Sequence, residues 1–373
     1  MKSKKVGIVT WFKSENFGTN LQAFALYHKI ELMGYDCFFI NEFPYEHFGI
    51  KEHILYLLNK LHLQSFVKSR FEKCQNRKRL MKAIQFFDTN TKIRYAYSRK
   101  EYTRLMKEFD TFISGSDQIW NPNHFNSFYY LDFAIGKKKI AYASSIGVTN
   151  YTKEQKTKII PLIKDFNYCG LRENSAVKLV NGVLGYDKAI TVVDPTFLLS
   201  AEDWEDIIYK SQIVFEEDYI ICYLIGNREE YYSQIQDIVS KSDTDKIVVI
   251  KSIENPNIDL TGCCSKIEYL TEIGIEDFVA LIKNAKIVCT DSFHATAISI
   301  NLRKDFVEFM RFSQDDPESQ NSRIIDILER YGLSDRIYNG NNPFCEIDYE
   351  RVRSLLEADI RHSVKFLSNS LEN

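Results

Sequence analysis

The stretch KIVCTDSFHATAISIN, from Lys286 to Asn301, contains a short strand, a polar turn and the start of a helix. Residues 287–289 are apolar and β-branched or small, which is typical of a strand that helices cover on both faces of a parallel sheet. Asp291 and Ser292 follow the strand, and either side chain can cap a helix that begins near His294. The segment therefore predicts an α/β fold with His294 at a strand-to-helix junction.

His294 stands where open α/β sheets usually bind their ligands, beyond the carboxyl end of a strand. The N–H groups and the dipole of a helix N-terminus attract anions, and a bound anion would stabilise the protonated form of a nearby imidazole. The alternative is that His294 only satisfies a helix cap or packs at a seam between domains. The rest of the chain has to decide between these two interpretations.

The chain has 373 residues, which is more than one hydrophobic core usually supports, so we expect two domains. Aromatic residues make up 14% of it, with only 7 Pro and 15 Gly, and this composition indicates a globular protein rather than a disordered or fibrous one. The cysteines lie mostly inside apolar runs and form no CxxC pair. We therefore expect reduced core cysteines, no structural metal and no cofactor.

The N-terminal residues MKSKKVGIVTWFK carry positive charge, but their apolar run is short and no small-residue cleavage site follows it. We interpret them as a first strand rather than a signal peptide. No run of about 18 apolar residues occurs along the chain, so a membrane-spanning helix is not expected. The prediction is a cytoplasmic protein.

Basic residues are concentrated between Lys51 and Glu108, where 15 Lys/Arg stand against 5 Asp/Glu in a chain of net charge -3. Two helices are predicted there, an amphipathic one through Ile54, Leu55, Leu58 and Leu61 and a basic one with Lys68, Arg70, Lys73, Arg77, Lys78 and Arg79. A helical hairpin packed on its domain explains the pattern. The alternative is attraction to a lipid-linked acceptor or to an anionic membrane surface, which would make the protein peripheral at the inner membrane face. Nucleic acid is not expected, since no binding module is recognisable.

Strands and helices alternate along both halves of the chain, which predicts parallel sheets. In the first half, strands are predicted at 5–11, 36–41, 109–113, 139–144 and 168–171, with helices at 19–33 and 173–180. In the second, strands are predicted at 219–225, 246–251, 287–289 and 306–309, with helices at 229–240, 275–284 and from about 321. We expect two Rossmann-like domains, 1–195 with a basic insertion at about 51–108, and 196–345. A long C-terminal helix within 346–373 is expected to pack back on the first domain.

The loop FKSENFGTN follows the first predicted strand and places Asn16 and Gly18 beside a helix start, with Gln22 one turn further on. Such a loop can hold a phosphate or a sugar through its backbone N–H groups. It matches neither GxGxxG nor GxxxxGK[ST], so it is neither of the standard nucleotide-binding fingerprints. We predict that these three residues contribute to substrate binding.

The turn GSDQIWNP, which begins at Gly115, follows a later strand and brings small, acidic, amide and aromatic residues together. Groups of this kind hold sugar hydroxyls and a sugar ring face, and strand ends are where function collects in α/β folds. The predicted substrate-binding residues are Ser116, Asp117, Gln118, Trp120 and Asn121. The alternative is a structural turn with Trp120 in the core.

Arg172 follows the strand at 168–171 and therefore stands at a strand tip, where a guanidinium can bind a carboxylate or phosphate through two hydrogen bonds. A polar loop, RFSQDDPESQNSR, follows the strand at 306–309 and is bounded by Arg311 and Arg323. A long polar loop beside a cleft can act as a lid.

Six segments occur in one order from Asn16 to about Ala295: NFGTNLQAFAL, FISGSDQIWNP, KKKIAYASSIG, LRENSA, VVDPTFLL and CTDSFHA. Together they resemble the polysaccharide pyruvyltransferase family. The resemblance implies two domains facing a cleft, as in GT-B glycosyltransferases, and transfer of pyruvate from phosphoenolpyruvate to a sugar in cell-surface or capsular polysaccharide biosynthesis. The arginine and histidine that family members place in the cleft match Arg172 and His294. Many members have Arg-Leu-His where this chain has Ser-Phe-His, so the anion contact of that first arginine is absent or comes from elsewhere.

Elementary chemistry agrees with this resemblance. A pyruvate ketal forms when the vinyl carbon of phosphoenolpyruvate is protonated, the cation at its central carbon is stabilised, and two sugar hydroxyls replace phosphate. We predict His294 as the proton-transfer residue, Arg172 as the anion anchor and Asp117 as a base or sugar-binding group. Ser292, with the N–H groups after it, and Arg323 are predicted to hold anionic oxygens. The competing hypotheses are a GT-B glycosyltransferase that uses a nucleotide-sugar and a catalytically silent carbohydrate-binding relative.

Overall fold

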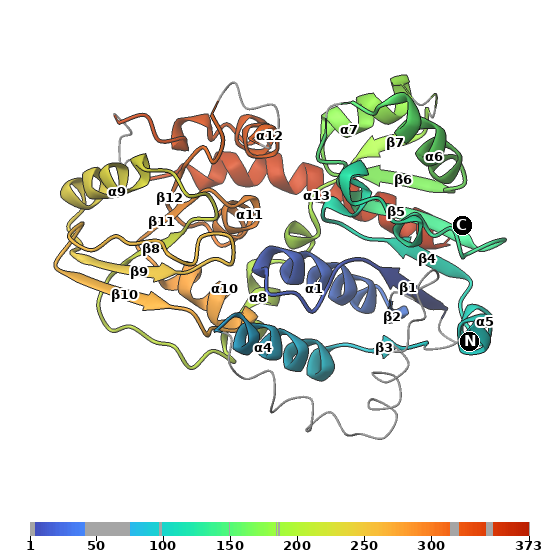
Figure 1. The fold of residues 1–373 in the computed structure, drawn as a ribbon, viewed down its shortest axis with the longest axis horizontal. Helices are drawn as coiled ribbons and strands as arrows, with labels where there is room; N and C mark the ends of the chain where they lie inside the picture. Colours follow the sequence, from blue (N-terminus) through green and yellow to red (C-terminus); the bar gives the residue numbers. More distant parts are fainter. Residues whose placement is uncertain are drawn as a thin grey trace.

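The structure is a computed structural model that describes residues 4–41, 75–96, 99–148, 150–183, 185, 187–313, 321–340 and 346–372. The predicted amphipathic helix at 54–61, the basic residues Lys68, Arg70 and Lys73, and positions 314–320 of the polar loop lie outside the described residues. Two parallel sheets, each flanked by helices, form the described part of the chain (Figure 1). The predicted α/β class is therefore confirmed.

The first sheet has the order β3-β2-β1-β4-β5-β6-β7 in the described part of the chain, and its neighbouring strands are parallel. Its strands are β1 (Lys5–Val9), β2 (Asp36–Ile40), β3 (Ile93–Arg94), β4 (Thr111–Ser114), β5 (Lys138–Ser144), β6 (Tyr168–Leu171) and β7 (Ala189–Thr191). The accompanying helices are α1 (Phe17–Leu32), α4 (Gln75–Asn90), α5 (Arg99–Met106), α6 (Lys153–Lys164) and α7 (Asn174–Lys178). The strand order reverses between β1 and β4, and such switch points are where open α/β sheets bind ligands.

The second sheet has the order β10-β9-β8-β11-β12, again with parallel neighbours. Its strands are β8 (Ile220–Tyr223), β9 (Lys246–Ile250), β10 (Lys266–Leu270), β11 (Ile287–Thr290) and β12 (Phe306–Glu308). Its helices are α8 (Ala201–Ile208), α9 (Glu230–Lys241), α10 (Ile275–Asn284), α11 (Phe293–Asn301) and α12 (Ser322–Arg330). The edge strand β10 and the short helix α8 are absent from the elements predicted above, because β10 is partly exposed and α8 has only 8 residues.

The chain passes from the first sheet to the second between Thr191 and Ile220, an interval that includes Pro195. The domain boundary at Pro195 stays a prediction. One apolar cluster runs through both halves, and at its centre the Phe17 ring stacks on Phe278 with centroids 4.4 Å apart. This packing holds the N-terminus of α1 against the second half.

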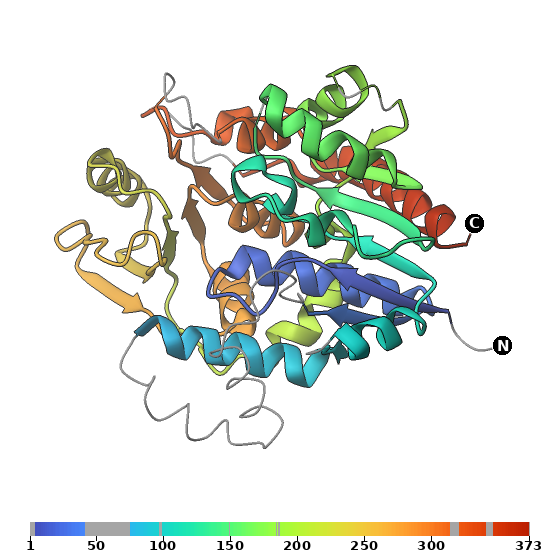
Figure 2. The ribbon, with the colours of Figure 1, turned by 45° about the vertical axis from the view of Figure 1, so that its right-hand side comes forward.

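The final helix, α13 (Tyr349–Glu372), extends from the second half to the first sheet. Figure 2 shows it, in red, alongside the green strands of that sheet. The Ser363 hydroxyl accepts a hydrogen bond from the Val193 backbone N–H (2.9 Å), and the Lys138 ammonium donates to the carbonyls of Ser370 and Leu371 (both 3.2 Å). No helix in the described part of the chain is long and apolar enough to cross a bilayer.

Helix α4 carries the described part of the basic segment, and its cations bind the second half of the protein. Arg79 Nη2 donates to the carbonyls of Lys251 (2.6 Å) and Thr271 (2.9 Å). Lys78 pairs with Glu272 at 2.8 Å, and Lys82 of the same helix pairs with Asp277 at 3.2 Å. These contacts agree with the interpretation that the helix packs on the protein. Contact of the basic segment with a membrane stays a prediction.

Candidate functional site

The N-termini of two helices, α1 and α11, meet between the sheets. Asn16 caps α1 by accepting a hydrogen bond from the Thr19 N–H (3.3 Å), and Ser292 caps α11 by accepting from the Ala295 N–H (3.5 Å). A Cβ added at Gly18 would lie 2.1 Å from His294 Nδ1, so glycine is required for this approach. Two positive helix ends that lie so close favour an anion between them.

His294 is buried at this junction, with 8% of the residue exposed. Its Nε2 atom is 3.7 Å from Asp194 Oδ2 and has no hydrogen-bond partner among the described residues. Burial lowers the pKa of His294 below its ordinary value, although the carboxylates of Asp194 and Asp117 oppose this. Burial therefore favours a neutral imidazole, and a bound anion would favour its protonation.

Asp194, a residue that the sequence interpretation leaves out of the site, connects its charged groups. Its Oδ2 atom accepts hydrogen bonds from Arg172 Nη1 (3.1 Å) and the Ser116 hydroxyl (3.2 Å) and faces His294. Its Oδ1 atom accepts from the backbone N–H (3.0 Å) and hydroxyl (2.8 Å) of Thr196. Burial alone would raise the pKa of Asp194, but His294, Arg172 and the Thr196 bonds lower it below the ordinary value. Asp194 is therefore a buried carboxylate at neutral pH.

Arg172 lies between two carboxylates and over an aromatic ring. Its Nε donates to Glu173 (2.9 Å) and its Nη1 to Asp194 (3.1 Å), while its guanidinium lies 4.5 Å from the centre of the Phe293 ring. Burial would lower the pKa of Arg172, but the charges of Glu173, Asp194 and Asp117 raise it above the ordinary value. Its Nη2 is buried without a hydrogen-bond partner in the described structure. Arg172 is thus a fixed cation that still has N–H donors to offer.

Asp117 is held at the end of β4 with a φ of 71°, which is rare for a residue other than glycine. Its carboxylate accepts hydrogen bonds from the Thr19 hydroxyl (2.7 Å) and the Gln118 N–H (2.8 Å). Strained backbone of this kind is concentrated at functional sites. Asp117 therefore connects the turn after β4 to the first turn of α1. Its negative charge also acts to raise the pKa values of His294 and Arg172.

Trp120 lies in the core, so its ring offers no face to a sugar in this structure. It has 0% exposure, stacks on Tyr130 with centroids 5.1 Å apart, and donates from Nε1 to the Ser114 hydroxyl (3.0 Å). The turn follows the buried strand β4, and the indole fills the space beside that strand. The structure agrees with the alternative of a structural turn with Trp120 in the core. The geometry of Trp120 does not support the predicted contact with a sugar.

The predicted amide side chains also bond within the protein. Gln22 Nε2 donates to the carbonyls of Thr19 (2.8 Å) and Trp11 (3.1 Å). Asn121 Nδ2 donates to Gln118 Oε1 at 2.9 Å. These bonds shape the loops that carry Asn16 and Asp117, and a direct ligand contact by Gln22, Gln118 or Asn121 stays a prediction.

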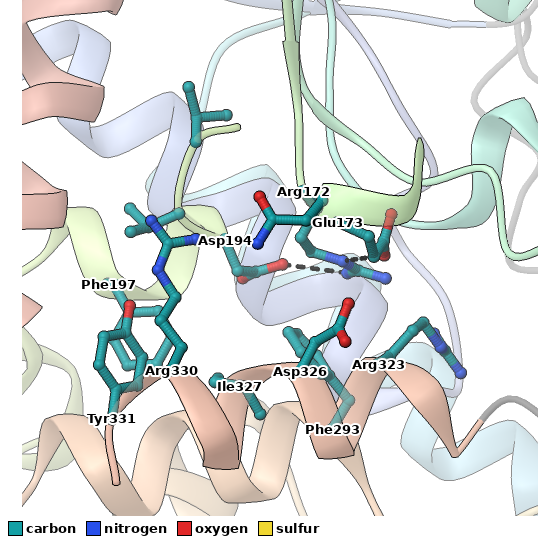
Figure 3. A pocket seen from close by; sticks show the side chains of 13 residues that line it. Arg172, Glu173, Asp194, Phe197, Phe293, Arg323, Asp326, Ile327, Arg330 and Tyr331 are labelled. Atoms are coloured by element: carbon teal, nitrogen blue, oxygen red, sulfur yellow. Dashed lines mark hydrogen bonds and ion pairs between the residues drawn. The ribbon is translucent and has the colours of Figure 1, made fainter. Parts of the chain in front are cut away.

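A partly open pocket with a cavity volume of about 40 Å³ adjoins the cluster, between Arg172, Glu173 and Asp194 on one side and α12 on the other (Figure 3). Arg323 also lines it, but in Figure 3 its guanidinium extends away from Arg172. Burial, followed by the positive charge of Arg172, lowers the pKa of Arg323 to about 10. Arg323 thus remains a cation at neutral pH at the rim of the pocket.

Solved structures with a similar fold include UDP-GlcNAc 2-epimerase from Methanocaldococcus jannaschii, with a TM-score of 0.52 and 12% identity over 95% of this chain and 92% of that one. Another UDP-N-acetylglucosamine 2-epimerase has a TM-score of 0.50 and 10% identity over 98% of both chains. At such low identity the likeness shows the fold alone, two Rossmann-like domains of the GT-B type.

No curated protein sequence matches the chain significantly. The model of the family described as polysaccharide pyruvyl transferase matches residues 16–309, which include Arg172, Asp194 and His294. The resemblance carried by the six sequence segments is thereby confirmed. The chain belongs to the polysaccharide pyruvyl transferase family.

Proposed function

We propose that this protein transfers pyruvate from phosphoenolpyruvate to two hydroxyls of a sugar as a ketal, with release of phosphate, in cell-surface polysaccharide biosynthesis. The observation that carries the proposal is the buried cluster of His294, Arg172 and Asp194 beside two helix N-termini. It combines a group that can move a proton, a fixed cation and N–H groups for anionic oxygens. These are the groups that the reaction requires.

Phosphoenolpyruvate carries a phosphate and a carboxylate, and the site offers two kinds of anion contact. The N-termini of α1 and α11 supply backbone N–H groups, and Arg172 supplies Nη2, which has no partner among the described residues. Electrostatic contacts in a buried, water-poor site are stronger than in solution. An anion bound there would also raise the pKa of His294 and so prepare it to donate a proton.

The reaction balances with one proton-transfer residue. Protonated His294 gives its proton to the methylene carbon, the first sugar hydroxyl adds to the cationic central carbon, and the proton of that hydroxyl returns to the imidazole. The second hydroxyl then replaces phosphate at the same carbon, and its proton leaves with the phosphate. Asp194, 3.7 Å from His294 Nε2, stabilises the imidazolium.

A nucleotide-sugar transferase is the competing hypothesis, and it needs a site for a diphosphate. In the second sheet, the switch point between β8 and β11 would be the natural place. There the N–H groups of Ile225 and Gly226 donate to the chain's own Asp291 carboxylate, both at 2.7 Å. Because the chain's own carboxylate already binds the N–H groups that could hold a diphosphate, we favour phosphoenolpyruvate over a nucleotide-sugar as the donor.

The test is to incubate the protein with phosphoenolpyruvate and a panel of free and lipid-linked glycosides and to measure inorganic phosphate. We expect phosphate release only when both donor and acceptor are present, and much slower release with Arg172→Ala when phosphoenolpyruvate is below saturation. Phosphate that never exceeds the protein-free control, together with release of a nucleoside diphosphate from a nucleotide-sugar, would establish the competing hypothesis.

We also propose that the basic segment between Lys51 and Glu108 brings the protein to a lipid-linked acceptor. Each Lys or Arg near an anionic surface contributes about 1 kcal/mol of binding, and salt screens the attraction. Sedimentation with phosphatidylserine vesicles should show binding at low salt that disappears at high salt. Binding that is absent at low salt, or unchanged at high salt, contradicts this part of the proposal.

A further inference from the structure

We infer that the pocket between Arg172, Glu173 and α12 binds hydroxyls of the sugar acceptor next to the reacting pair. The inference rests on the proposed function and extends it by giving the acceptor a place. Figure 3 shows Asp326 extending from α12 towards Arg172 and Glu173, with the pocket between them. The reacting hydroxyls of the same sugar would extend from this pocket past Arg172 towards His294, because Asp194 bonds to Arg172 and faces His294.

Two buried polar atoms at this pocket have no hydrogen-bond partner among the described residues. They are Arg172 Nη2, whose two N–H groups can serve the donor anion and a hydroxyl at once, and Glu173 Oε2, an acceptor; the two side chains are 3% and 7% exposed. The other oxygen of Glu173 is already used, because it accepts from Ser145 (2.7 Å) and Arg172 (2.9 Å). Buried polar atoms are normally paired, so the pocket calls for a ligand that both donates and accepts hydrogen bonds.

Asp326 supplies a third polar group. It forms no hydrogen bond or ion pair with the residues that the structure describes, and the neighbouring Arg330 is bound to Asp359. Burial, followed by the negative charge of Glu173, raises the pKa of Asp326 above its ordinary value. Its carboxyl group is therefore free to bind a hydroxyl that enters between α12 and Glu173.

The chemistry of the lining selects a neutral polyol. The pocket is lined by three arginines and three acids, so its formal charges offset one another and no net charge favours an anion. An apolar ligand would leave the buried polar atoms unpaired. A hydroxyl can donate to a carboxylate and accept from the guanidinium at once. A cavity of about 40 Å³ admits hydroxyl groups at one edge of a sugar, with the ring outside.

The test compares Asp326→Asn with Glu329→Gln, an exposed position on the same helix that does not line the pocket. The probe is methyl β-D-galactopyranoside, a neutral glycoside that carries both a 1,2-diol and a 1,3-diol, and its binding is followed by saturation-transfer NMR. We expect Asp326→Asn to weaken glycoside binding about tenfold to a hundredfold, the effect of losing a hydrogen bond to a charged group. Glu329→Gln should bind like the wild type, and phosphoenolpyruvate affinity by calorimetry should be unchanged in both.

Two results overturn the inference: wild-type protein that does not bind the glycoside at millimolar concentrations, or Asp326→Asn that binds it as tightly as the wild type does. The failure of the proposed function is a separate outcome. If the glycoside binds through Asp326 but no phosphate is released from phosphoenolpyruvate, the polyol site stands and the transfer reaction is wrong. If phosphate is released and the acceptor KM of Asp326→Asn equals that of the wild type, the reaction stands and the site is wrong.

Discussion

Asp194 and Asp291 are both fully buried, and each lies just beyond the carboxyl end of a strand with an arginine beside it. Their partners differ. Asp291 accepts hydrogen bonds from the backbone N–H groups of Ile225 and Gly226 and from the Tyr231 hydroxyl, all at 2.7 Å. Asp194 instead bonds or faces the titratable and charged side chains of the cluster.

The two aspartates differ in the hydrogen-bonding groups that surround them. The partners of Asp291 are fixed backbone groups and a tyrosine, so the interaction clamps the β8–α9 loop to the start of α11. The partners of Asp194 retain unpaired atoms, since Arg172 Nη2 and His294 Nε2 have no hydrogen-bond partner among the described residues. Arg311 Nε, 3.6 Å from Asp291, is also buried without a hydrogen-bond partner among the described residues. A buried carboxylate at a strand end is therefore not a site by itself, and the titratable histidine beside Asp194 distinguishes it from Asp291.

The largest expected effect comes from His294→Ala, which removes the proton-transfer group beside Asp194. Turnover should fall by about 10²- to 10⁴-fold, the usual contribution of a positioned acid or base, while phosphoenolpyruvate binding is largely retained. Tyr231→Phe, which removes a hydroxyl from the Asp291 clamp, is the matched control and should lower stability without changing turnover. Single-turnover rates of both variants test this prediction. Near wild-type turnover in His294→Ala would show that His294 does not transfer the proton.

The next effect is on donor affinity. Arg172→Ala should weaken phosphoenolpyruvate binding about tenfold to a hundredfold, because a charge-assisted contact to an anionic oxygen is lost. Arg172→Lys should recover only part of the affinity, since a point charge cannot reproduce the guanidinium fork. Calorimetry measures both, and unchanged affinity in Arg172→Ala contradicts its role as the anion anchor.

Asp194→Asn and Asp291→Asn compare the two aspartates directly. Asp194→Asn should lower turnover about tenfold, the usual effect of losing a hydrogen bond to a charged group. It should also move the pH–rate profile towards lower pH, because the Asp194 carboxylate raises the pKa of His294. Asp291→Asn should cost about 1–3 kcal/mol of unfolding free energy, from buried N–H groups left unpaired.

Turnover of folded Asp291→Asn, and its pH profile, should match those of the wild type. Denaturant unfolding and pH–rate curves of both variants provide the comparison. Equal losses of turnover in the two variants would show that the aspartates do not differ in the way described.

The smallest effect concerns Glu308, a third buried acid, which has a threonine hydroxyl as a partner. Burial raises the pKa of Glu308 well above its ordinary value. The folded state therefore holds this proton more tightly than the unfolded state, so the contribution of Glu308 to stability falls as pH rises above the unfolded pKa. Between about pH 5 and pH 8, Glu308→Gln should gain melting temperature relative to the wild type. A difference in melting temperature between Glu308→Gln and the wild type that does not change with pH would contradict the raised pKa of Glu308.

Local sequence patterns predicted the strands other than β3, β7 and β10, and the two residues at strand tips, Arg172 and His294. Alternating apolar runs and helix caps depend on near neighbours, and parallel strands place their carboxyl ends at one edge of a sheet. Asp194 was missed because an Asp-Pro pair after a strand is typical of a turn, and VVDPT was interpreted as a crossover between domains. The pairing of β6 with β7 places this side chain near Arg172, and the packing of the two sheets brings it to His294.

Long-range packing also explains the remaining differences. The cations of α4 have partners in the second half of the chain, with Lys78 and Glu272 separated by 194 positions and Lys82 and Asp277 by 195. A charge run does not reveal such partners. Likewise, nothing within GSDQIWNP indicates whether Trp120 points into the core or into a cleft, since that depends on the space beside β4.

The most direct test of the central claim is mass spectrometry of a glycoside after reaction with phosphoenolpyruvate in D₂O and back-exchange in water. If His294 protonates the methylene carbon, the product should carry one pyruvate unit less one water, one carbon-bound deuteron in its methyl group, and one phosphate released per ketal. His294→Ala should give no such product under the same conditions. An unmodified glycoside, or an enolpyruvyl ether without the methyl deuteron, would contradict the account.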